Sequence, residues 1–160
     1  PAAAFWIRRE LPALLVTLVD VDFDSGPSSR YQLWIGLRGL ADDMPELAAE
    51  LQIVLSRSGS RPGYRAYDAL ADPVLAHHFL ETLQTSEPVA GGGGATFRLR
   101  ALDGGPLGLD DPVSIHPLSA QQSNSSIVFG EQFLLKVFRR VWSGVNPDLE
   151  LLQALARIGF

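Results

Sequence analysis

The chain has 160 residues, 46% hydrophobic and 19% charged, so it is long enough to bury a substantial core as one domain or two small ones. A formal net charge of −5, with no basic run longer than an arginine pair, argues against a nucleic-acid partner. The absence of cysteine excludes a disulfide framework and suits a reducing cytoplasm, and no apolar run approaches the roughly 20 residues that a membrane span needs. Because no signal peptide is visible and the chain begins at Pro1, we expect a cytoplasmic protein of which this is a piece.

The first elements are expected to form an antiparallel pair of strands. Residues 1–9 are predicted to be a short tail or the start of a helix. Residues 14–24 are predicted to form a strand, because apolar and acidic side chains alternate over 19–24, and a turn at 25–29 leads into a returning strand at 30–37.

Three acids of the first of these strands, Asp20, Asp22 and Asp24, suggest a calcium loop. An EF-hand loop requires glycine at its sixth position and glutamate at its twelfth, where this chain has Ser25 and Tyr31. We therefore predict no metal site here, and either a solvated sheet face or a sheet edge whose charges oppose pairing with another chain.

The sequence does not decide the secondary structure of residues 46–55. Residues 46–50 have helical propensity, whereas 52–55 fit a buried strand equally well, and periodicity alone does not separate the two. A loop is predicted at 56–63 and a short strand at 64–67.

A helix is predicted to begin at Asp72 and Pro73, a favourable N-cap and a favourable first residue. One face of this helix is apolar: Leu75, Phe79, Leu80 and Leu83. The adjacent His77 and His78 point about 100° apart on it, so they are poor joint ligands for one metal ion.

The run of four glycines at 91–94 marks the main change along the chain. It is not followed by the Lys-Ser or Lys-Thr of a phosphate-binding Walker loop, so a linker or a long flexible hairpin is the better interpretation. A strand is expected at 96–102 and a loop at 103–112. We predict an α+β fold with an N-terminal cap domain at 1–90, built of an antiparallel sheet and a helix, and a second antiparallel subdomain at 91–160.

The second subdomain is predicted to be a strand meander followed by a helix. Its parts are a strand beginning at His116, a loop at 120–124, strands at 125–129 and 133–138 joined by a turn at Gly130, and a helix opened by Asn146 and Pro147.

The single lysine of the chain, Lys136, lies in the last of these strands among apolar residues. An ammonium group is costly to bury there unless an anion meets it, and a phosphate is one such anion. Glu150 follows 14 residues later on the predicted helix. A lysine on a third strand paired with a glutamate on the next helix is the arrangement of protein kinases. The alternative is a lysine that extends to solvent from a strand edge and a solvated helix acid.

Three linked segments sharpen this choice: Gln122–Gly130, Leu134–Arg140 and Gly144–Glu150. Together they closely resemble the nucleotide-binding lobe of bacterial maltokinases, which are ATP-dependent maltose 1-kinases with a fold similar to aminoglycoside phosphotransferases. Two upstream segments, Arg30–Leu33 and Tyr67–Pro73, look more loosely like the N-terminal cap domain of that family.

The resemblance implies a role for each matching residue. The segment that braces the phosphates in place of a glycine-rich loop would comprise Gln122, Ser123, Asn124, Ser125 and Ser126. Lys136 and Glu150 would form the ion pair that holds the nucleotide. The cofactors implied are ATP and Mg²⁺, and the implied partners are maltose or another sugar and, in fused forms, trehalose synthase.

No histidine, aspartate or asparagine follows Glu150, so the catalytic base and metal ligands of the family are expected beyond Phe160. We therefore predict a nucleotide-binding subdomain truncated at its C-terminus and inactive alone, with no catalytic or metal-ligating residue of its own. Two alternatives remain open: a related kinase with another acceptor such as glucosamine, and a non-catalytic cap or interaction module that docks onto a partner such as trehalose synthase.

Overall fold

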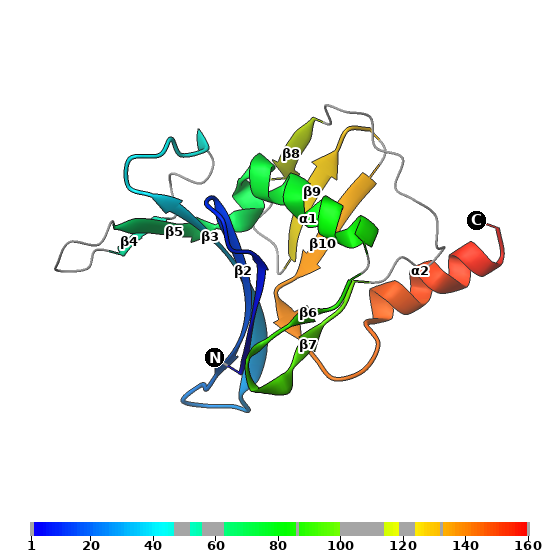
Figure 1. Ribbon diagram of the computed structural model, residues 1–160. Coiled ribbons are helices and arrows are strands. Elements are labelled where there is room, and N and C mark those ends of the chain that lie inside the picture. Colours follow the sequence, from blue (N-terminus) through cyan, green and yellow to red (C-terminus); the bar gives the residue numbers. More distant parts are fainter. Residues whose placement is uncertain are drawn as a thin grey trace.

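A computed structural model describes residues 2–46, 52–55, 63–85, 87–99, 114–118, 124–131 and 133–159. In this part of the chain, two antiparallel sheets and a short hairpin pack with one buried helix, and a second helix lies at the C-terminal end (Figure 1). The α+β class predicted from the sequence is confirmed.

The larger sheet is antiparallel throughout. Its strands, in spatial order, are β1 (Ala3–Arg8), β2 (Ala13–Val21), β3 (Ser29–Gly39), β5 (Tyr64–Asp68) and β4 (Gln52–Leu55). A sixth strand from much later in the chain, β11 (Arg140–Val141), pairs with the start of β3. β4 confirms the strand interpretation of residues 52–55, whereas the predicted helical segment after Glu46 and most of the predicted loop at 56–63 lie outside the described residues.

The N-terminal segment corrects the prediction of a tail or a helical start. It forms β1, which pairs with β2 from Ala3 opposite Leu18 to Arg8 opposite Leu14. The side chain of Phe5 is buried, so the strand gains both ladder hydrogen bonds and apolar burial. A partner that lies further along the chain thus decides the conformation of a segment whose own propensity is weak.

The acidic strand is shorter than the alternation predicted. β2 ends at Val21, so Asp22 and Asp24 lie beyond it and do not share a strand face with Asp20. Asp20 accepts two hydrogen bonds from Arg30 across the strand pair, at 2.7 and 3.0 Å. The hydrogen bond from Arg30 holds the pKa of Asp20 below its ordinary value.

The buried helix is α1 (Pro73–Thr85), preceded by the short 3-10 helix η2 (Ala69–Ala71). The backbone N–H of Val74 donates to Asp72 Oδ1 at 3.0 Å, which confirms the predicted cap. Figure 1 shows α1 lying between the larger sheet and the smaller one. Its buried side chains are Leu75, Ala76, Phe79 and Leu80.

The four glycines at 91–94 lie in the turn of a short hairpin, which agrees with the hairpin interpretation of this segment rather than the linker one. β6 (Val89–Ala90) and β7 (Thr96–Phe97) pair around the 3-10 turn η3 (Gly92–Gly94), in which Gly93 and Gly94 have φ values of +66° and +77°. The hairpin lies against β1, where the rings of Phe5 and Phe97 are 5.6 Å apart. The strand predicted at 96–102 is shorter than expected, because β7 ends at Phe97 and the next two residues, Arg98 and Leu99, are not in a strand. The rest of that predicted strand and the predicted loop at 103–112 lie outside the described residues.

The smaller sheet confirms the predicted meander of three strands. β8 (Ile115–Leu118), β9 (Asn124–Phe129) and β10 (Phe133–Phe138) are antiparallel, with β9 in the middle. The chain then adds β11 to the larger sheet and enters α2 (Pro147–Arg157), which is capped by Asn146 as predicted.

One buried cluster joins the segments on the two sides of the predicted domain boundary at residue 90. It contains Leu14, Trp34, Leu75 and Phe79 from the first segment together with Ile127, Phe129 and Val137 from the second. Gln32 adds a polar connection, because its backbone N–H donates to the Arg139 carbonyl at 2.8 Å and its side-chain amide donates to the Phe138 carbonyl at 2.7 Å. The two segments share a core, and the boundary itself stays a prediction.

Candidate functional site

The two faces of the smaller sheet differ sharply. Residues directly opposite each other in an antiparallel pair share a face, and successive residues alternate between faces. The inner face belongs to the shared core or packs against it: Ile115, Ile127, Phe129, Phe133, Leu135 and Val137. Lys136 is directly opposite Ser126 and therefore lies on the outer face, beside Leu134 and Phe138 of its own strand.

The ammonium group of Lys136 has two partners on this face. Its Nζ lies 2.5 Å from Asp148 Oδ2 and 4.8 Å from the centroid of the Phe138 ring. The Lys136 side chain is 40% exposed and that of Asp148 is 52% exposed, so water screens the ion pair. Lys136 is thus not buried, and the anion that meets it in the structure is the Asp148 carboxylate.

The start of α2 explains why Asp148 reaches the lysine. Asn146 caps the helix by accepting from the backbone N–H of Asp148 at 2.8 Å, and Pro147 occupies the first helical position. A carboxylate in the first turn also interacts favourably with the helix dipole. The cap therefore fixes Asp148 at the end of α2 nearest to the strand that carries Lys136.

This arrangement corrects the expected partner of Lys136. The predicted ion pair was with Glu150, but in the structure the carboxylate on Lys136 belongs to Asp148, and the exposed Glu150 forms no ion pair with any described residue. Glu150 is two positions after Asp148, which is about 200° around the helix axis, so the two acids point to opposite sides of α2. The spacing from Lys136 correctly predicted that its partner lies in the first turns of α2. The orientation of the helix, however, brings Asp148 rather than Glu150 to the lysine.

The predicted phosphate-bracing residues are divided between the two faces. Asn124 and Ser126 share the outer face with Lys136, because they are opposite Phe138 and Lys136. Ser125 lies on the other side, where its hydroxyl accepts hydrogen bonds from Arg139 at 2.8 and 3.0 Å. Gln122 and Ser123 lie outside the described residues, and Asn124, predicted to be in the loop, is the first residue of β9.

Sequence reasoning did not anticipate two polar contacts near this site. One is Asp148, whose signal was available as an acid in the first turn of a well-capped helix. The other is Arg139, which lies 3.5 Å from Asp68, a residue at the distant end of β5. No local pattern could have found the second pair.

The outer face offers one cation, the Ser126 hydroxyl and the Asn124 amide, and a row of such donors suits phosphate oxygens. Within the described ranges, no three His, Cys, Asp or Glu side chains come close enough together to hold a metal ion. Among the helices that the structure describes, none is both long and apolar enough to span a membrane. No model of a known protein family matches the chain.

Proposed function

We propose that this chain is the nucleotide-binding part of a cytoplasmic ATP-dependent kinase that phosphorylates maltose to maltose 1-phosphate, on a route from trehalose to glycogen. The observation that supports this best is the placement of Lys136. It projects from the outer face of a three-stranded antiparallel meander and is paired with a carboxylate in the first turn of the following helix. The maltokinase-like motifs of the sequence fall on these same elements.

In this proposal Lys136 binds the phosphates of ATP as a point charge, and Asp148 holds the ammonium in position until the nucleotide arrives. Asn124 and Ser126 donate from the same face, and the proposal keeps Gln122 and Ser123, which precede them in the sequence, in the bracing segment. Ser125 contributes differently, because its hydroxyl orients Arg139. Glu150 replaces Asp148 as the partner of Lys136 only if α2 rotates about its axis.

Mg²⁺ would neutralise charge on the transferred phosphoryl group, and its ligands need at least two well-placed oxygen donors. No metal-binding cluster occurs among the described residues, and the proposal assigns none of them to the metal, the catalytic base or the sugar pocket. The isolated chain should then bind ATP without turning it over. A related kinase with another acceptor such as glucosamine is the alternative within this class, because the proposal assigns no residue of this site to the acceptor.

A second candidate is an interaction module that docks onto a partner such as trehalose synthase. The observation that favours it is α2, none of whose residues is buried. Leu151 and Leu152 of α2 are 61% and 62% exposed, and its C-cap residue Ile158 is 77% exposed; such a group of exposed apolar side chains is typical of an interaction surface.

Equilibrium titration calorimetry of the chain with ATP, with and without Mg²⁺, tests the first candidate. We expect saturable binding that weakens about tenfold or more in Lys136→Ala, because the lysine supplies the phosphate contact. Arg157→Gln removes a positive charge from the far end of α2 and is the matched control. Absence of ATP binding at millimolar concentration, or equal binding by Lys136→Ala, would overturn the nucleotide proposal.

The same substitution in the longer enzyme separates the two candidates. A kinase should lose about a hundredfold to a thousandfold in turnover in Lys136→Ala, the usual cost of removing a charge-stabilising group. A docking module should keep its partner, measured by co-sedimentation with trehalose synthase, and should instead lose it in Leu152→Asp. Wild-type kinase activity in Lys136→Ala would contradict the first candidate.

A further inference from the structure

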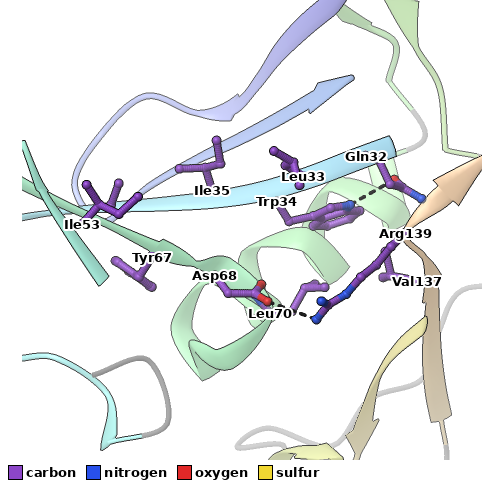
Figure 2. Close-up of a pocket in the computed structure, with 11 residues that line it drawn as sticks. Gln32, Leu33, Trp34, Ile35, Ile53, Tyr67, Asp68, Leu70, Val137 and Arg139 are labelled. Carbon is purple, nitrogen blue, oxygen red and sulfur yellow. Dashed lines mark hydrogen bonds and ion pairs between the residues drawn. The ribbon is translucent and has the colours of Figure 1, made fainter. Parts of the chain in front are cut away.

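A cavity of about 300 Å³ lies where the larger sheet meets the end of β10. Trp34 of β3, Leu70 of η2 and Val137 of β10 form its apolar wall, and all three are buried. Asp68 and Arg139 line its polar end, and Figure 2 shows their side chains reaching toward each other below the Trp34 ring. We call this space the junction cavity, after these five residues.

The side-chain hydrogen-bonding groups at the apolar wall already have partners within the protein. The indole N–H of Trp34 donates to Gln32 Oε1 at 3.0 Å, and the amide of Gln32 donates in turn to the Phe138 carbonyl. The Tyr67 hydroxyl is likewise engaged, because it donates to Asp72. A polar group placed against this wall would lose its water without a replacement, so the part of a ligand that enters must be apolar.

At the polar end, Arg139 and Asp68 carry opposite charges but form only a weak ion pair with each other. Arg139 Nη2 and Asp68 Oδ2 are 3.5 Å apart, longer than the roughly 2.7–2.9 Å of a strong charge-assisted hydrogen bond. Asp68 Oδ1 accepts from the backbone N–H of Leu70 at 3.1 Å, and Arg139 donates from Nε and Nη2 to Ser125. Within the described part of the chain, no residue accepts from Arg139 Nη1.

We infer that the junction cavity binds a small zwitterion with an apolar side chain, that is, an apolar α-amino acid. The carboxylate of the ligand binds the guanidinium of Arg139, and its ammonium binds the carboxylate of Asp68. The side chain of the ligand lies against Trp34, Leu70 and Val137. A plain anion would be repelled by Asp68, and a plain cation by Arg139. The cavity volume is at the small end of ligand pockets, which fits a ligand of this size.

The matching of opposite charges is the reason to prefer this class. Arg139 and Asp68 place one positive and one negative charge at the rim of the cavity. They favour a ligand whose own two opposite charges are as close together as the ammonium and carboxylate of an α-amino acid, because each ligand charge then forms a charge-assisted hydrogen bond. The inference concerns a site on the inner side of the smaller sheet and does not depend on nucleotide binding at Lys136, which faces outward.

Calorimetric titration of the unmodified chain with three related compounds tests the inference. L-phenylalanine carries both charges, 3-phenylpropionate lacks the ammonium, and 2-phenylethylamine lacks the carboxylate. We expect saturable binding of phenylalanine and about tenfold weaker binding of each analogue, since each loses one charge-assisted contact. No phenylalanine binding at tens of millimolar, or binding of either analogue as tight as that of phenylalanine, would overturn it.

Two variants locate the site on the chain. Arg139→Gln and Asp68→Asn remove one rim charge each, and asparagine keeps the acceptor for the Leu70 N–H. Each should weaken phenylalanine binding about tenfold while circular dichroism stays unchanged. The matched control is Arg140→Gln, whose guanidinium lies over the exposed Trp142 and outside the cavity. Unchanged affinity in both rim variants, or equal loss in Arg140→Gln, would place the ligand elsewhere and refute the assignment.

Discussion

Two of the cation–carboxylate pairs in the described part of the chain lie in opposite environments. Arg38 and Asp72 are paired at 2.8 Å with side chains 14% and 0% exposed, whereas Lys136 and Asp148 are paired at 2.5 Å with side chains 40% and 52% exposed. The two pairs have similar N–O distances but differ in how strongly each charge depends on its partner. In the first pair both charges are withdrawn from water and must satisfy each other, while in the second pair either charge can exchange its partner for water or a ligand.

The buried pair belongs to a larger polar unit, which we call the buried triad: Arg38, Tyr67 and Asp72. Asp72 Oδ2 accepts from Arg38 Nη2, from Arg38 Nε at 3.1 Å and from the Tyr67 hydroxyl at 2.5 Å, while its Oδ1 caps α1. The triad thus connects β3, β5 and the start of α1. No buried polar side-chain atom in the described part of the chain lacks a hydrogen-bond partner, which is the condition under which such a network rigidifies a core.

The largest effect on folding is expected from breaking the triad. Asp72→Asn keeps the cap of α1 but leaves the Arg38 guanidinium without its counter-charge, so we expect a loss of about 3 kcal/mol in the free energy of unfolding. Urea denaturation followed by circular dichroism measures it. Asp20→Asn is the control, because it breaks the solvent-exposed ion pair between Asp20 and Arg30 and should cost far less than Asp72→Asn. Similar costs for the two variants would show that burial does not distinguish the pairs.

The second prediction concerns alkaline pH. Burial, followed by the hydrogen bond to Asp72, raises the pKa of Tyr67 well above its ordinary value of about 10. A group whose pKa is raised by folding contributes its full stability below the unfolded pKa and loses it above. We therefore expect the free energy of unfolding to fall by up to about 1.4 kcal/mol for each pH unit above pH 10 on account of Tyr67.

Tyr67→Phe isolates this contribution. The variant should lose about 1.5 kcal/mol at neutral pH, because the hydroxyl donates to a charged group, and the gap to the unmodified chain should narrow above pH 10. Urea midpoints at pH 8, 10 and 11 measure the gap. A constant gap across this range would mean that Tyr67 ionises as readily in the folded chain as in the unfolded one.

The contrast between the two pairs also shows what the sequence could and could not predict. The cap of α1 at Asp72 and the three-strand meander follow from local signals, and the structure confirms both. The second role of Asp72 could not be seen, because its partner Arg38 lies 34 residues away on a strand whose position depends on the whole sheet. The strand β1 was missed for the same reason, since only its pairing with β2 and the burial of Phe5 make it a strand.

At the candidate site, the sequence located the elements but not the orientation of their side chains. Lys136 and the capped start of α2 were both predicted from local patterns. Which acid meets the lysine depends on the rotation of α2 about its axis, and no local sequence pattern specifies that rotation. Likewise, the register of β9 places Ser126 beside Lys136 and turns Ser125 toward Arg139.

The smallest expected effect is the one that identifies the partner of Lys136. A double-mutant cycle of Lys136→Ala with Asp148→Asn, measured by urea denaturation, should give a coupling of about 0.2–1 kcal/mol, as for other exposed ion pairs. The matched cycle of Lys136→Ala with Glu150→Gln should give a coupling near zero, because Glu150 is on the opposite side of α2. Raising the salt concentration should shrink the first coupling and leave the second unchanged. If the coupling instead appeared with Glu150, α2 in solution would be rotated by about half a turn from the arrangement described here, and the kinase-like pair expected from the motif would be the ground state.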